Sequence, residues 1–175
     1  GVATGVRARP QALRREASTL FGMQQALTAR IRGLDGPIFE ACPRRRGEEA
    51  SRQCRGLRDR QREREGALRQ VAEAAVDTYR TLVMDHPQYR GMDEVLFSWA
   101  FSLDELDRHE EARSVYRQLI KRYPSSRFVP HAWLSFAEFY FSDGDMNIAR
   151  QMYDKVLEFP PPDNRVYGYS LYKQA

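Results

Sequence analysis

The chain has 175 residues, of which 42% are hydrophobic and 30% charged, and its formal net charge is +4. This composition is sufficient to bury the core of one elongated domain. No apolar run of about 20 residues is present, so the sequence shows no membrane-spanning helix, and no signal sequence is visible.

The charge is unevenly distributed along the chain. Up to Gly66 there are 15 Arg and no Lys against 8 acidic residues, whereas from Ala67 onward 13 basic residues face 16 acidic ones. Composition and periodicity change at the same point. We therefore predict a basic helical hairpin over residues 1–66, a repeat region over 67–162 and the start of a further repeat over 163–175.

Two helices are predicted in the N-terminal hairpin. The first carries an apolar stripe at helical spacing, formed by Leu13, Ala17, Leu20, Met23 or Gln24, Leu27, Ile31 and Leu34. Asp35-Gly36-Pro37 is expected to kink or break this helix. The second helix is predicted from Glu48 to about Asp85, and its charged stretch from Arg58 to Glu65 is expected to form a solvated arm.

The chain's two cysteines, Cys42 and Cys54, both lie in this hairpin. Two lone cysteines do not complete a zinc site, which leaves free thiols or a disulfide as the alternatives. We predict the disulfide, because the two cysteines flank a short turn between helices. A bridge would close a short loop and stabilise the hairpin by about 3 kcal/mol. Disulfides persist in the periplasm and outside the cell, not in the cytosol.

An electrostatic patch is expected on the hairpin, at Arg44, Arg45, Arg46, Arg52 and Arg55. An acidic partner or an anionic membrane surface would suit it. Nucleic acid is less favoured, because glutamates interleave with the arginines and no aromatic side chain lies nearby to stack on bases. A solvated helix face is the simplest alternative.

Five columns of matching residues recur every 37 residues after the hairpin. They are Ala75, Ala112 and Ala149; Tyr79, Tyr116 and Tyr153; Leu82, Leu119 and Val156; Val83, Ile120 and Leu157; and Pro87, Pro124 and Pro161. A period of this length is typical of stacked supersecondary units. Such units bury their apolar faces against neighbours and leave an extended surface for partners.

Each unit reads as a helical hairpin. Leu96, Trp99, Ala100 and Leu103 form the stripe of one helix, and Ala112, Val115, Tyr116 and Leu119 that of the next. Pro124 ends the second helix. In the following unit Pro130 is predicted to start a helix, Gly144 to take a positive φ in the turn, and Asp145 to cap the next helix.

These residues resemble the tetratricopeptide repeat family, whose pattern is matched by Trp133, Ala137, Tyr140, Ala149, Tyr153 and Pro161. The family period is usually about 34 residues, so this chain departs from it in length. The string from Arg122 to Ser126 is similar to repeats of bacterial envelope assembly factors of the BamD and YbgF type. The ending from Tyr167 to Ala175 resembles tetratricopeptide proteins of gliding bacteria.

The resemblance implies a concave groove lined by the first helix of each repeat. The corresponding positions are Glu94, Phe97, Phe101, Asp104, His131, Leu134, Glu138 and Phe141. An apolar peptide or helix with basic flanks would fit such a groove. The alternative is that the phenylalanines pack between successive repeats.

No catalytic constellation is recognisable. His86, His109 and His131 have no cysteine, serine or carboxylate at nucleophile or metal spacing, and there is no glycine-rich phosphate loop. We therefore expect no enzyme, no cofactor and no metal site.

The sequence predicts an all-α solenoid of tetratricopeptide-like hairpins behind a long N-terminal hairpin. The expected function is a non-catalytic scaffold of a bacterial envelope assembly, periplasmic or associated with the outer membrane. A cytoplasmic adaptor or chaperone-like module is the alternative. Tyr169 and Tyr172 stand where a further first helix would begin, so we expect more repeats after Ala175.

Overall fold

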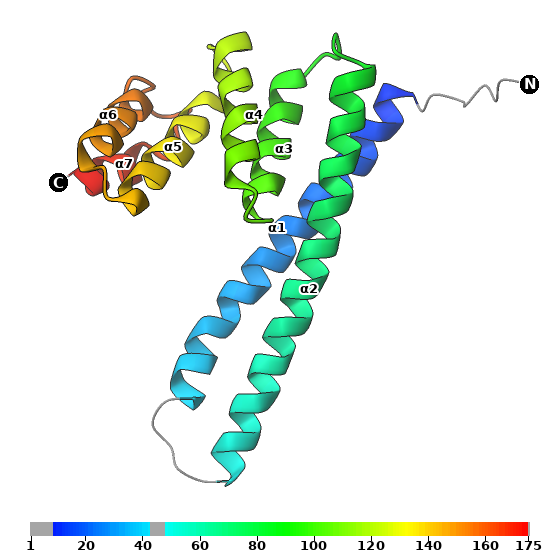
Figure 1. Cartoon of the computed structure of the whole chain (residues 1–175), viewed down its shortest axis with the longest axis vertical. Helices are drawn as coiled ribbons and strands as arrows, with labels where there is room; N and C mark the ends of the chain where they lie inside the picture. The colour runs from blue at the N-terminus through cyan, green and yellow to red at the C-terminus, as the bar shows by residue number, and fades with distance from the viewer. Residues whose placement is uncertain (1–8, 43–47, 175) are drawn as a thin grey trace, which may run out of the picture. The chain divides into compact units, whose positions relative to one another are not determined.

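The structure is a computed structural model that describes residues 9–42 and 48–174. These residues form helices and no strands, as predicted: α1 (Pro10–Ala41), α2 (Glu48–Asp85), α3 (Met92–Asp104), α4 (His109–Arg122), α5 (Val129–Asp143), α6 (Met146–Leu157) and α7 (Tyr167–Gln174) (Figure 1). Among the described residues, no helix combines the length and the apolarity needed to cross a membrane.

The chain divides into two compact units, Gly1–His86 and Pro87–Ala175. The change of composition near Gly66 therefore falls inside α2, which runs without interruption from Glu48 to Asp85 as predicted. One continuous helix carries both the charged stretch and the first set of repeat columns.

In the first unit α1 and α2 lie side by side and antiparallel (Figure 1). The Tyr79 hydroxyl donates to the Ala17 carbonyl (3.1 Å) and the Arg64 guanidinium donates to the Arg30 carbonyl (3.0 Å), so one register is kept along the pair. At the far end Cys42 and Cys54 form a disulfide, with their Cα atoms 5.1 Å apart.

Two details of α1 differ from or refine the prediction. The helix is not broken at Asp35-Gly36-Pro37: it continues through Pro37 to Ala41, and the Cys42 N–H donates to the Ile38 carbonyl (2.9 Å). On the packed face Gln24 is buried, while Met23 is 49% exposed. Of the two residues considered for this position of the stripe, the packed one is therefore the polar Gln24.

The repeat columns keep their burial in both units. The alanine, tyrosine and first aliphatic columns are all buried: Ala75, Ala112, Ala149, Tyr79, Tyr116, Tyr153, Leu82, Leu119 and Val156. The second aliphatic column is half-buried and the proline column is exposed in all three copies. The end of α2 is therefore packed in the same way as α4 and α6.

The helix paired with the end of α2 has the chemistry of a first repeat helix. Pro10, Leu13, Ala17 and Leu20 have the same spacing as Pro130, Trp133, Ala137 and Tyr140. Ala17 is as buried as Ala137, and it accepts from Tyr79 where Glu138, next to Ala137, accepts from Tyr153. Ala17 and Ala75 are 58 residues apart, whereas Ala137 and Ala149 are 12 apart. The first unit is thus a repeat-like hairpin whose turn is extended into a long two-helix arm.

In the second unit α3 and α4 form one hairpin and α5 and α6 the next (Figure 1). Gly144 has φ +85°, and the Asp145 carboxylate accepts from the Ile148 N–H (3.1 Å), which confirms the predicted turn and cap. The loop before α7 is held by Asn164, whose side-chain amide donates to the Val156 and Phe159 carbonyls (both 2.8 Å).

Candidate protein-binding groove

The residues at the predicted groove positions come from α3 and α5, which are the first helices of two successive hairpins. Phe97 of α3 meets the His131 ring of α5 edge-on, with ring centroids 5.7 Å apart. Phe101 lies one turn further along α3, 6.4 Å from Phe97. Three of the eight predicted positions are therefore brought into one aromatic cluster.

Phe97 also packs into the junction between the two repeats. Its ring stacks on Phe128, which precedes α5, at 4.7 Å, and approaches Tyr116 of α4 at 6.4 Å. Phe97 is half-buried by these contacts. These ring contacts place Phe97 at the junction between successive repeats, where the alternative prediction for the phenylalanines expects it.

The remaining α5 positions have different surroundings. Leu134 packs on the core of its own hairpin, against Ala137, Ala149 and Tyr153. Phe141 is 38% exposed, and the Lys173 ammonium of α7 lies 3.6 Å from its ring centroid. Lys173 also pairs with Glu138 at 3.4 Å. Glu94 of α3 is half-buried.

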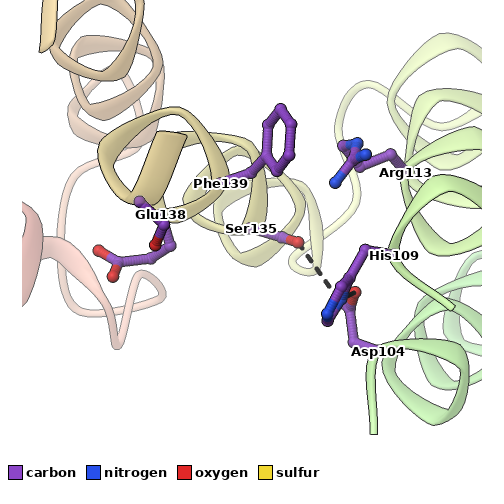
Figure 2. A pocket seen from close by; sticks show the side chains of 7 residues that line it. Asp104, His109, Arg113, Ser135, Glu138 and Phe139 are labelled. Atoms are coloured by element: carbon purple, nitrogen blue, oxygen red, sulfur yellow. Dashed lines mark hydrogen bonds and ion pairs between the residues drawn. The ribbon is translucent and has the colours of Figure 1, made fainter. Parts of the chain in front are cut away.

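A pocket of about 320 Å³ lies on the groove side of α5, where α5 meets α3 and α4. Figure 2 shows Ser135 of α5 pointing toward the Asp104 carboxylate of α3, to which it donates at 3.3 Å. His109 lies 3.2 Å from the same carboxylate through Nδ1. Ser135 and His109 both hydrogen-bond to the Asp104 carboxylate and not to each other. The three side chains therefore form a structural hydrogen-bonded cluster and not a nucleophile with its base.

The burial of these groups shifts their titration. Burial raises the pKa of Asp104, against the smaller opposing effects of the His109 and Ser135 hydrogen bonds. Burial, followed by the nearby Asp104 charge, raises the pKa of Tyr116 well above its ordinary value. The pKa of Tyr153 is raised by burial and by its hydrogen bond to Glu138. Burial lowers the pKa of His131, which is therefore neutral at neutral pH.

Arg113 is a site residue that the sequence analysis missed. Its guanidinium lies 3.6 Å from the Phe139 ring centroid, across the junction between α4 and α5 (Figure 2), and it pairs with Glu110. The side chain is only 8% exposed. An arginine next to alanine on the buried stripe of α4 was the available signal, because a buried cation requires a partner.

The predicted electrostatic patch is described only in part. Arg52 and Arg55 are exposed on α2. Arg44, Arg45 and Arg46 lie outside the described residues. The nearby Cys42–Cys54 bridge ties the described end of α1 to the start of α2.

Comparison with known protein families agrees with this architecture. Residues 94–126 and 130–163 each match the tetratricopeptide repeat family, and they correspond to α3 with α4 and to α5 with α6. The chain therefore contains two tetratricopeptide repeats, which are modules of protein–protein interaction. Neither the curated proteins nor the solved structures contain a match to the chain.

Proposed function

We propose that this chain is a non-catalytic scaffold of a bacterial envelope assembly, which holds a peptide or helix of a partner protein against α3 and α5. The observation that carries the proposal is the pair of tetratricopeptide repeats, whose first helices place Phe101 beside the contact between Phe97 and His131. Phe101 and Phe141 would supply apolar contacts. The carboxylates at Glu94, Asp104 and Glu138 favour a segment with basic flanks.

The compartment is part of the same proposal. The Cys42–Cys54 bridge supports an oxidising environment, such as the periplasm, over the cytosol. An acidic protein or an anionic membrane surface would be the partner of Arg52, Arg55 and the neighbouring Arg44–Arg46. Fractionation of the native cells tests the assignment, and recovery of the protein with reduced cysteines in the cytosol would contradict it.

The groove can be tested with a display library of short random peptides selected on the whole chain. We expect enriched peptides to carry apolar residues beside Lys or Arg. Phe101→Ala should lower the affinity for a labelled, selected peptide by about tenfold, as measured by fluorescence anisotropy, because aromatic anchors dominate such interfaces. Tyr172→Ala, which removes an aromatic ring that is 77% exposed, is the matched control.

Phe97 is unsuitable as the test residue, because its stacking on Phe128 makes it part of the junction between repeats. Unchanged helicity by circular dichroism should accompany the loss of binding in Phe101→Ala. If Phe101→Ala binds every selected peptide as tightly as the unmodified chain, the groove is not the docking surface.

A further inference from the structure

A second hollow lies on the other side of α5, between α4, α5 and α6 (the rear hollow). It has a volume of about 310 Å³, and its apolar lining consists of Ile120, Trp133, Phe136, Tyr140, Ile148 and Met152. On α5 the lining positions 133, 136 and 140 point away from positions 135, 139 and 142 of the groove-side pocket, given 3.6 residues per turn. The two hollows therefore use different faces of one helix.

Phe136 belongs to the buried core, but the other apolar side chains of the lining stay half-buried. Ala137, Ala149 and Tyr153 form one cluster of the buried core, and Tyr140 and Met152 pack against this cluster from the rear hollow while staying half-buried. Trp133 is also half-buried, and its ring lies 5.9 Å from Phe136. A concave, mostly apolar site with a few polar groups is the usual form of a binding pocket.

Two cations of α4, Arg117 and Lys121, complete the lining. They lie one turn apart and are exposed, and the Arg117 guanidinium is 6.0 Å from the Phe136 ring centroid. Within the described part of the chain neither has an ion-pair partner, whereas Arg113 of the same helix pairs with Glu110. No acidic side chain lines the hollow. Its charge is therefore opposite to that of the groove.

We propose that the rear hollow is a second docking site, which takes an apolar side chain of a partner protein flanked by acidic residues. The apolar side chain would enter between Trp133 and Met152. The adjacent carboxylates would meet Arg117 and Lys121, and this complementary charge selects against the basic segment expected in the groove. The site does not depend on the groove function, so the two can be tested separately.

The test uses the same peptide library on the whole chain, with an acidic-flanked peptide labelled for anisotropy. Arg117→Glu should lower the affinity for this peptide by at least about tenfold, because the new glutamate then repels the acidic residues of the peptide. Arg150→Glu, which makes the same charge change on an exposed residue of α6 outside the hollow, should leave the affinity unchanged. Replacing the acidic residues of the peptide with lysines should restore its binding to the Arg117→Glu variant.

A direct readout comes from Trp133, one of the two tryptophans in the chain. Trp99→Phe leaves it as the sole reporter, and the change removes a buried Nε1–H that has no hydrogen-bond partner. The acidic peptide should then shift the Trp133 emission to the blue, as water is displaced from the ring. An unchanged emission spectrum would overturn the proposal. Two other results would also overturn it. One is a set of selected peptides whose binding is weakened only by Phe101→Ala. The other is a shift of the Trp133 emission that the fatty acid dodecanoate produces and no peptide does.

Discussion

At the scale of single residues, the tyrosine column shows how one repeated position meets three different environments. Tyr79, Tyr116 and Tyr153 are almost equally buried, and each hydroxyl needs an acceptor. Tyr79 donates to the Ala17 backbone carbonyl and Tyr153 to the Glu138 carboxylate. For Tyr116 the nearby group is the Asp104 carboxylate, which adds to burial in raising the pKa of the hydroxyl. The column conserves the ring's packing, while the acceptor is supplied by whichever group lies opposite.

The carboxylate beside Tyr116 leads to a prediction about alkaline stability. The folded pKa of Tyr116 lies well above 10.0, the value expected when it is unfolded, so its contribution to stability is full below pH 10.0 and is lost as the pH rises further. Tyr116→Phe should cost about 1 kcal/mol at neutral pH, because the buried hydroxyl loses its polar interaction with Asp104. Above pH 10.0 its free energy of unfolding should fall less steeply than that of the unmodified chain.

Urea unfolding at a series of alkaline pH values would measure both effects. Tyr172→Phe makes the same chemical change on an exposed ring and should follow the unmodified chain throughout. Parallel pH profiles for Tyr116→Phe and the unmodified chain would show that this hydroxyl does not control the alkaline transition.

At the scale of secondary-structure elements, α1 and α2 each serve two structural roles. The start of α1 and the end of α2 pack like the two helices of a repeat, through Ala17, Ala75 and Tyr79. Their other halves form the arm that the Cys42–Cys54 bridge closes. A long insertion at a helical turn is tolerated because closing a longer loop adds little entropy cost, and here the loop is itself helical.

This description of α1 predicts a sharp difference between two alanines of the same helix. Ala17→Leu should destabilise the first unit by about 1–3 kcal/mol, because a larger side chain does not fit where the Tyr79 ring lies against the helix. Ala26→Leu, at an exposed position on α1, should change stability by less than about 0.5 kcal/mol. Thermal unfolding followed by circular dichroism provides the comparison, and equal effects would contradict a repeat-like packing of Ala17.

At the scale of the whole molecule, the division into two units separates the disulfide from both tryptophans. Cys42 and Cys54 lie in the first unit, and Trp99 and Trp133 lie in the second. Circular dichroism reports on the helices of both units, while tryptophan fluorescence reports on the second alone. The molecule therefore carries its own probes for telling the two units apart.

Reduction of the disulfide should destabilise the first unit selectively. The loss is expected to be about 3 kcal/mol in the loop-entropy description. Cys42→Ser with Cys54→Ser should lower the melting temperature seen by circular dichroism without moving the fluorescence transition. Protein isolated from its native compartment should have no thiol open to alkylation. Two alkylated cysteines in that sample would refute both the native bridge and the oxidising compartment.

Much of the local structure could be predicted because helical periodicity and turn chemistry act over short distances. The bounds of α2, the positive φ of Gly144 and the Asp145 cap all follow from neighbouring residues. The 37-residue columns then identified the second helix of each repeat. By itself, therefore, the sequence determined an all-α chain of repeated helical hairpins.

Contacts between distant residues were decided only by the tertiary structure. The first helix of the N-terminal hairpin was not recognisable as a repeat helix, because its partner in α2 is 58 residues away at the Ala17–Ala75 pair. Gln24 and Met23 lie at the same edge of one stripe, and the packing of α2 buries the amide. Arg113 and the rear hollow likewise depend on how α4 meets α5, which no local pattern encodes.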